Sequence, residues 1–462
     1  MTQQPTITYP TIDLFLYDLR EGLGQDAENV KENRKQFWKK IYPNLDEKQL
    51  EELVEKSEKL EKAEADYVQL LIPQKQEKFQ PDLEGYYWAL QLGDTYALQL
   101  DCSLVNPLNG NPLSSFTPIK QEIESRLNHQ KGKIGQTWFV WCQLEKDYQD
   151  LDQIATECCK QLTPNPDWVR DLEKQGELAG ATLFELWYPP EDWADEQSFQ
   201  ENFHLIIALF PHRSSSRLFS NKLSMDSINT SLSDSYFDLI RLFGYRNKMI
   251  WAYHQSRRLK AKLKKEYTSI QQAIKKVNNL PQQLNAGRPN LDELQKTLTQ
   301  TLTILSDYAT NLSDLDDQGR TIRVNLENYK KRLKKITDEN SNSKSEVLKK
   351  FSELVGEKYL VQVETDHANL SPGLVLLENL ITTIKGTVEI YQTKSDRTLN
   401  TTIAIAGIGL ATSQIASAVI LTQPPKTKDP LAFRTEAFFW SLGIGAMIAM
   451  LITLAILRPF RR

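Results

Sequence analysis

The sequence has few of the residues that build disulfide frameworks and metal sites. Of its 462 residues, only four are cysteine and five are histidine. Cys102, Cys142, Cys158 and Cys159 form no Cys-x-x-Cys pair, and adjacent cysteines cannot bridge without strain. We therefore expect four reduced, buried thiols. No two histidines are spaced four residues apart, so no zinc-type site is predicted, and any metal site is left unassigned.

Signatures of catalysis and of export are absent as well. The chain has no Gly-x4-Gly-Lys-Ser/Thr loop, no Gly-x-Gly-x-x-Gly after a predicted strand, no nucleophile elbow and no His-Glu-x-x-His. We predict no enzymatic activity and no cofactor. Residues 1–9 lack a basic segment followed by an apolar one, so we expect the long hydrophilic part of the chain to stay in the cytoplasm.

Neither sign of charge dominates. The 56 basic and 60 acidic side chains give a formal net charge of −4, which indicates neither a nucleic-acid binder nor an acidic tail. Six basic residues between Arg257 and Lys265 lie near aromatic side chains, but an apolar stripe runs through them. A solvated helix face explains them better than nucleic acid or acidic lipid, and we expect no nucleic-acid partner.

Long apolar runs occur only near the C-terminus. Segments 401–422 and 437–457 contain no charged residue over 22 and 21 positions. As helices they would be roughly 33 and 31 Å long, against a hydrocarbon core of about 30 Å. Three prolines in the connection 423–436 suit a tight loop. We therefore predict two transmembrane helices in a lipid bilayer, in preference to two buried helices of a soluble core.

Positive charges near the ends of these spans predict their orientation. Three basic residues precede the first span: Lys385, Lys394 and Arg397. Three follow the second span: Arg458, Arg461 and Arg462. Three lie in the loop between the spans: Lys426, Lys428 and Arg434. The excess outside the loop places both termini in the cytoplasm. We expect a multi-pass protein of the cell (inner) membrane.

Each predicted span has one distinctive face. Small residues recur every four positions on the second span: Ser441, Gly445, Ala449 and Thr453. This spacing favours close packing against another helix. Small and polar residues lie near one face of the first span. They are Asn400, Gly407, Gln414 and Ser417. That face either packs against another helix or lines the pore of an oligomer.

The middle of the chain predicts long helices. Between 291 and 336, twelve of fourteen heptad seam positions are apolar, with Thr301 and Gly319 as the exceptions and Gly319 as the expected weak point. Residues 235–280 also have helical periodicity, and a short segment with Pro281, Gly287 and Pro289 follows. An antiparallel helical hairpin is expected, so the seam can be satisfied within one chain.

A further helix is predicted to lead into the membrane. A short helix is expected near 346–356. After Ser371 and Pro372, a heptad stripe continues to the first span without a proline, which predicts one helix over about 373–422. Such a helix could transmit a movement of the cytosolic part to the membrane.

The N-terminal part predicts a mixed α/β sheet. Strands are expected at 11–20, 86–92, 95–104, 137–144, 181–188 and 204–210, with a two-residue turn at Gly93 and Asp94. Helices are expected over 27–71 with a break at Pro43, and at 119–127, 150–162 and 166–175. Strands and helices alternate, as in α/β domains.

The fold class that we predict is an α+β membrane protein. It has a mixed-sheet α/β cytosolic domain, a long helical coiled-coil or stalk region and two C-terminal transmembrane helices. The predicted domains are 1–232 (α/β), 233–345 (helical hairpin), 346–400 (short helix and stalk), 401–422 and 437–457 (spans), 423–436 (loop) and 458–462 (basic tail).

This order of elements resembles the CorA-type divalent-cation channels along the whole chain. Two local segments also look like the family, one reading TWFVWCQLEKDYQDLDQIATECC from Thr137 and the other FHLIIALFPHRSSSRLF from Phe203. The tail Arg458, Arg461 and Arg462 resembles the basic ring of the family just inside the membrane. The resemblance implies a homo-oligomer, a pentamer in that family, and a divalent cation as the transported ion. Where the family has Gly-Met-Asn after the first span, this chain has VILTQPPKTKDP from Val419.

Two functions follow from these features. The first is an oligomeric ion (cation) channel or transporter gated by its cytosolic domain, with the first span lining the pore. The second is a non-conducting, membrane-tethered sensor or scaffold that binds a protein partner. The continuous stalk-to-span helix favours the first, and the missing Gly-Met-Asn favours the second.

Overall fold

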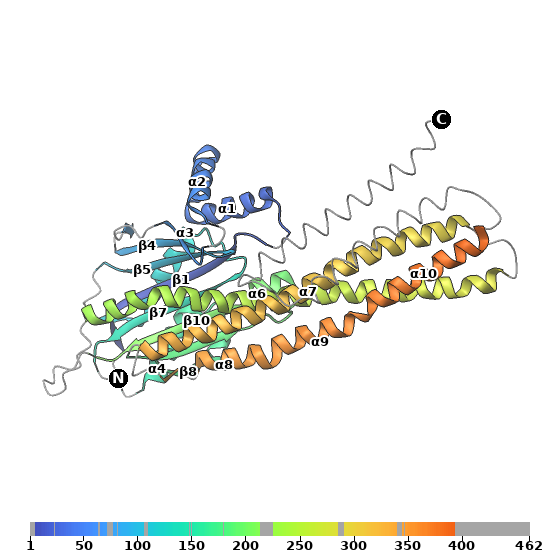
Figure 1. Cartoon of the computed structure of the whole chain (residues 1–462). Coiled ribbons are helices and arrows are strands. Elements are labelled where there is room, and N and C mark those ends of the chain that lie inside the picture. The colour runs from blue at the N-terminus through green and yellow to red at the C-terminus, as the bar shows by residue number, and fades with distance from the viewer. Residues whose placement is uncertain are drawn as a thin grey trace. The chain divides into compact units, whose positions relative to one another are not determined.

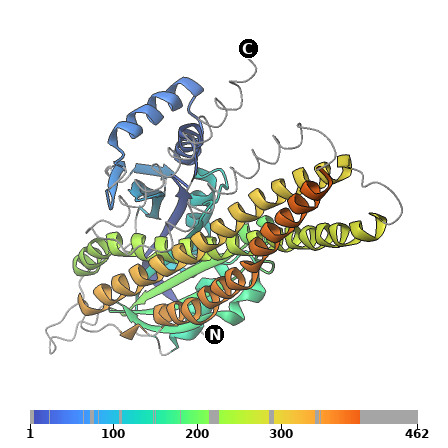
Figure 2. The ribbon, with the colours of Figure 1, turned by 45° about the vertical axis from the view of Figure 1, so that its right-hand side comes forward.

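Figure 1 and Figure 2 show a computed structural model of the chain. The described residues are 5–22, 24–62, 65–71, 77–80, 82–105, 110–146, 148, 150–178, 180–212, 225–284, 291–339, 344–345 and 347–392. The chain divides into two compact units. One comprises residues 1–264 and 311–370, and the other comprises 265–310 and 371–462.

The first unit is built on a mixed sheet, as predicted. Its described strands are β1 Thr6–Leu19, β2 Val68–Leu71, β3 Glu77–Gln80, β4 Leu83–Leu92, β5 Thr95–Leu104, β6 Asn111–Pro112, β7 Gly135–Leu144, β8 Glu173–Leu178, β9 Ala181–Tyr188, β10 Phe203–Phe210 and β11 Lys344–Ser345. The order across the sheet is β11-β8-β9-β10-β7-β1-β5-β4-β2, with β3 paired to β4 and β6 to β1. Strands β7 and β10 run parallel, and the other described pairs are antiparallel.

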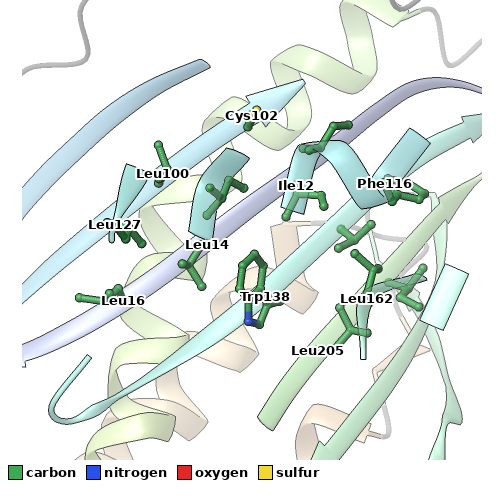
Figure 3. Packing of buried hydrophobic residues seen from close by; sticks show 14 of the residues in the cluster. Ile12, Leu14, Leu16, Leu100, Cys102, Phe116, Leu127, Trp138, Leu162 and Leu205 are labelled. Carbon is green, nitrogen blue, oxygen red and sulfur yellow. The ribbon is translucent and has the colours of Figure 1, made fainter. Parts of the chain in front are cut away.

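Strand β1 is central and buried on both faces. Its alternate residues Ile12, Leu14 and Leu16 belong to a large apolar cluster, whose packing Figure 3 shows. Asp13, Phe15 and Tyr17 lie on the opposite face, because successive side chains of a strand point to opposite sides. Burial on both faces explains why this strand is an almost continuous apolar run rather than a clean alternation.

Four helices cover the apolar face of the sheet. They are α1 Ala27–Ile41, α2 Glu47–Leu60, α3 Phe116–Arg126 and α4 Leu151–Leu162. Trp38, Val54, Ile123 and Ile154 from these four helices join the same cluster as Leu14. All four cysteines are free and buried, as predicted.

The β4–β5 hairpin is the most accurately predicted element. Leu92 pairs with Thr95, so Gly93 and Asp94 form the two-residue turn. Gly93 has a φ of 57°, a conformation that glycine adopts without the steric cost that a Cβ would bring.

Two helix predictions are wrong in part. The predicted helix at 27–71 gives α1 and α2 with a break around Pro43, but it ends at Leu60, and the final residues form strand β2. The predicted helix at 166–175 is a 3-10 turn, η2 Pro166–Asp171, followed by strand β8. Both missed strands are short, and pairing with β4 or β9 rather than local propensity fixes them.

The long helices are α6 Met225–Leu284 and α7 Leu291–Glu339. In the first unit, the seam residues Leu312, Leu315, Ile322, Leu326, Tyr329, Leu333 and Ile336 are all buried. Asp238, early in α6, pairs with Arg332 and Lys335, late in α7, so these parts of the helices are antiparallel. Gly319, the expected weak point, lies inside α7 without a break.

The helix predicted at 346–356 does not end there. Helix α8 Val347–Leu354 passes into a π-helical segment, η3 Val355–Leu360, then into α9 Val361–Leu370. Residue Ser371 separates α9 from α10 Pro372–Gln392. In the second unit, Leu377, Ile381 and Ile384 of α10 are buried, like Leu298 and Tyr308 of α7.

The predicted transmembrane helices lie outside the described residues. Among the helices that the structure describes, none is long and apolar enough to cross a membrane. The continuation of the 373–422 helix beyond Gln392 also falls outside the described part of the chain.

Candidate functional site: buried polar groups beneath helix α6

The site residues predicted from the sequence lie beyond the described chain. This applies to the pore-lining candidates Asn400, Gly407, Gln414 and Ser417, to the packing stripe Ser441, Gly445, Ala449 and Thr453, and to the basic tail Arg458, Arg461 and Arg462. The structure brings together a different set of polar residues, on the sheet face that α6 covers.

Helix α6 lies close against this face. The Tyr17 hydroxyl donates to the backbone carbonyl of Ile240 at 2.6 Å. Gly244 lies over the same ring, and a Cβ at that position would be 3.1 Å from Tyr17 Cε1. Phe243 packs against Phe15, with ring centroids 5.3 Å apart. A glycine on the inner side of the helix therefore permits the close approach of helix and sheet.

Two aspartates are buried together beneath Tyr236 of α6. Asp13 of β1 is directly opposite Asp101 of β5 in the antiparallel pair, with exposures of 0% and 6%. Gln99 Nε2 donates to Asp13 Oδ1 (2.7 Å), and the Tyr236 hydroxyl of α6 donates to Asp13 Oδ2 (2.8 Å). Among the described residues, no Lys, Arg or His pairs with either carboxyl group.

The pKa values of both carboxyl groups are raised. Burial raises the pKa of Asp13 to about 6, although hydrogen bonds from Gln99 and Tyr236 oppose the shift. Burial, followed by the charge of Asp13, raises the pKa of Asp101 well above its usual value. Two adjacent carboxylates without a cation cannot both ionise cheaply, so Asp101 holds a proton that it donates to Asp13.

A second network crosses the same face and links three strands to α6. Asn247 Nδ2 donates to Thr137 Oγ1 (2.9 Å), which lies 2.9 Å from His204 Nδ1. His204 Nε2 lies 2.9 Å from Glu185 Oε1. Burial and the charge of Arg246 lower the pKa of His204 to about 4, so the ring is neutral. The neutral ring then accepts from Thr137 and donates to Glu185.

Arg246 of α6 is the charged centre of this network. It is 0% exposed and its closest carboxylate is Glu185, at 3.6 Å. The guanidinium carbon lies 4.8 Å from the ring centroid of Trp187 and 4.5 Å from that of Phe351. None of its three nitrogens has a hydrogen-bond partner within the described chain. Two aromatic faces and one carboxylate therefore hold a fully buried charge.

Glu185 remains ionised beside Arg246. Burial alone would raise the pKa of this carboxyl group, but the hydrogen bond from His204 and the charge of Arg246 outweigh burial and lower it. Burial lowers the pKa of Arg246, and Glu185 opposes that shift. We therefore treat the pair as an ionised carboxylate and guanidinium.

Two cavities border the α6 face. The turn cavity, of about 410 Å³, is lined by the β4–β5 turn, by α6 and by α7, including Arg241, Tyr245, Lys248 and Asn328. The α8 cavity, of about 330 Å³, is lined by β8, β9 and α8, including Glu185, Trp187 and Phe351. The α8 cavity thus shares residues with the surroundings of Arg246, and a ligand there could influence that charge.

The basic residues of α6 have partners within the first unit. Arg257 and Lys260 bind Asp366 of α9 at 2.6 and 2.7 Å, and Arg258 binds Glu196 at 2.8 Å. These three residues therefore form ion pairs that link α6 to neighbouring elements, and they do not form a purely solvated face. Among the residues that the structure describes, no group of three or more His, Cys, Asp or Glu side chains could hold a metal ion.

Sequence reasoning missed both networks. Asp13 and Asp101 are 88 positions apart, and Thr137, Glu185, His204 and Arg246 come from four separate elements, so no local spacing marks them. One signal was present, because a charged residue in the middle of an apolar strand such as β1 is unusual and needs a buried partner.

Comparisons of the sequence with protein families and curated proteins, and of the structure with solved structures, found no match.

Proposed function

We propose that this chain is an oligomeric membrane protein of CorA-like build, a cation channel or transporter whose α/β unit controls a pore lined by the first of two C-terminal spans. The observation that supports this most is the path of the chain after the sheet. Helical residues follow one another from Val347 to Gln392, with Ser371 between α9 and α10. Eight residues, 393–400, separate Gln392 from the uncharged segment 401–422.

The beginning of this helical path packs against the charged network. Phe351 of α8 contacts the guanidinium of Arg246. The ring of Phe351 also contacts the ring of Trp187, and the centroids of these two rings are 5.6 Å apart. Lys350 of α8 reaches Glu173 of β8 at 3.3 Å. Gating requires that a ligand bind more tightly to one conformation of the protein than to another. If the two conformations differ in the position of α8, such a ligand would shift the population toward one of them.

Ion flux into vesicles that contain the full chain tests the proposal. We expect uptake of at least one monovalent or divalent cation above that of protein-free vesicles. Gln414→Leu should reduce it, because an apolar side chain would remove a water-binding group from the pore. Thr412→Val is the matched control, since it lies about 200° around the expected helix from Gln414. Flux at background for every ion would contradict the proposal.

A non-conducting membrane-tethered sensor or scaffold is the second candidate. The chain has no Gly-Met-Asn after the first predicted span, and the loop contains Lys426 and Lys428, which would repel cations at a pore mouth. In this case, both Gln414→Leu and Thr412→Val should leave membrane insertion and partner binding unchanged, and the wild-type chain should not conduct.

A further inference from the structure

The turn cavity contains one arginine, Arg241, that pairs with none of the acidic residues in the described part of the chain. The guanidinium carbon of Arg241 lies 4.3 Å from the ring centroid of Phe237 and 5.1 Å from that of Tyr67. These two rings contact each other edge to face, with centroids 4.8 Å apart. Within the described part of the chain, Arg241 has no ion pair and no hydrogen bond. Stacking on these rings therefore holds its position, and its N–H groups have no partner among the described residues.

Two other polar side chains of the cavity wall also lack a hydrogen-bond partner among the described residues. The side chains of Tyr245 and Asn328 line the cavity, and neither has a hydrogen-bond partner among the described residues. The neighbouring Asn325 differs, because its Nδ2 donates to the carbonyl of Thr321 at 2.8 Å. Two helices therefore direct a guanidinium, a hydroxyl and a side-chain amide toward one space.

The charge balance of the wall favours an anion at Arg241. Lys248 and Asp94 pair with each other across the wall, so their charges cancel locally. Asp66, the other acid of the wall, is exposed to solvent, where its field is screened. Arg241 is the one cation of the wall that is left without a described acidic partner.

We propose that the turn cavity binds a small organic anion whose carboxylate or phosphate group is held by Arg241 and contacted by Asn328 and Tyr245. The planar fork of a guanidinium matches the oxygen atoms of both groups, and stacking on aromatic rings reduces the entropy lost on binding. A volume of about 410 Å³ is in the range of pockets that enclose small ligands rather than a macromolecular segment.

The occupant would join three elements of the first unit. The β4–β5 turn, α6 and α7 supply most of the wall, together with residues 65–66, so a bound anion bridges the hairpin and both helices. This inference concerns binding alone and does not depend on the proposed transport function.

Binding to the purified full chain in detergent tests the inference. The probes are inorganic phosphate, AMP and citrate, with adenosine as the uncharged comparison, and the readouts are calorimetric titration and the thermal unfolding midpoint. We expect saturable binding of at least one anion and none of adenosine. Stronger binding of phosphate and AMP indicates a phosphate site, and stronger binding of citrate indicates a carboxylate site.

Two variants and one control locate the site. Arg241→Gln should weaken binding about 10- to 100-fold, because it removes charge-assisted hydrogen bonds. Asn328→Asp should weaken it as well, because the new carboxylate competes for Arg241, and this variant keeps the test possible if Arg241→Gln does not fold. Arg258→Gln removes an arginine of the same helix outside the cavity and should bind as wild type. Failure of all three anions to bind, or wild-type affinity in Arg241→Gln, would overturn the inference.

Discussion

Both faces of the sheet are covered by helices, but different side chains lie beneath them. On one face, α1 to α4 pack on Leu14, Trp138 and their neighbours in a continuous apolar cluster. On the other, α6 covers a carboxyl pair, a neutral histidine and a buried arginine. Apolar contact tolerates small shifts, whereas buried charges need particular partners in particular positions. Packing on the α6 face therefore depends on particular polar partners as well as on apolar contact.

The largest effect is expected at Glu185. In Glu185→Gln, Arg246 keeps its two aromatic neighbours but loses its carboxylate, and an uncompensated buried charge costs about 3–5 kcal/mol of the free energy of unfolding. The measurement is the thermal unfolding of the full chain, followed by tryptophan fluorescence. The control is Glu173→Gln, since the side chain of Glu173 is 61% exposed and pairs with the exposed Lys350; it should change little.

A paired substitution sharpens this test. If the cost comes from an unpaired charge, removing both partners in Glu185→Leu with Arg246→Met should restore most of the stability that Glu185→Gln loses. A double variant as unstable as the single one would show that shape, not charge balance, fixes this part of the face.

On the apolar face, Leu14→Ala should destabilise by about 2–5 kcal/mol through lost burial and a residual cavity. Leu14 is 2% exposed and belongs to the apolar cluster. Unlike the charge variants, its effect should hardly change with pH. A strong pH dependence of the loss would contradict the conclusion that apolar contact holds Leu14 in place.

Much of the fold could be predicted from the sequence, because its signals are local. The Gly93–Asp94 turn places two strands, and the heptad seam places α7, since both depend on short spacings. Strands β2, β8 and β11 could not be predicted, because they are short and their pairing partners fix them. The network around His204 depends on the order of the strands in the sheet, in which β10 lies between β9 and β7.

A hydrogen bond joins α6 to the carboxyl pair. Tyr236→Phe removes the hydroxyl that donates to Asp13 at 2.8 Å, and hydrogen bonds to charged groups contribute about 1.5–3 kcal/mol. Because that bond lowers the pKa of Asp13, the pKa should rise further in the variant. Infrared bands of the buried carboxyl groups across a pH titration would measure it, and an unchanged titration would argue against this contact.

The smallest effect is a slope of stability with pH. Burial raises the pKa of Asp13 from 3.8 to about 6, so the folded chain binds more protons than the unfolded chain between these values. The contribution of the pair is complete below about pH 4 and falls as pH rises through 6, by up to about 1.4 kcal/mol per pH unit for each proton. The raised pKa of Asp101 extends the fall to higher pH.

Asp101→Asn isolates this slope. The amide can donate to Asp13 without titrating, so the variant should lose less stability than wild type between pH 5 and 8. Asp152→Asn changes an exposed carboxylate of α4 and should follow wild type. If stability fell with pH to the same extent in wild type and in Asp101→Asn, the pair would not share a proton.

The number of chains in the detergent-solubilised protein tests the proposed function most directly, because two spans per chain cannot enclose a pore alone. Light scattering of the purified full chain, corrected for bound detergent, gives that number. We predict an assembly of several chains, with five expected for a CorA-like build. A monomer at micromolar concentration would contradict the channel and leave the membrane-tethered sensor.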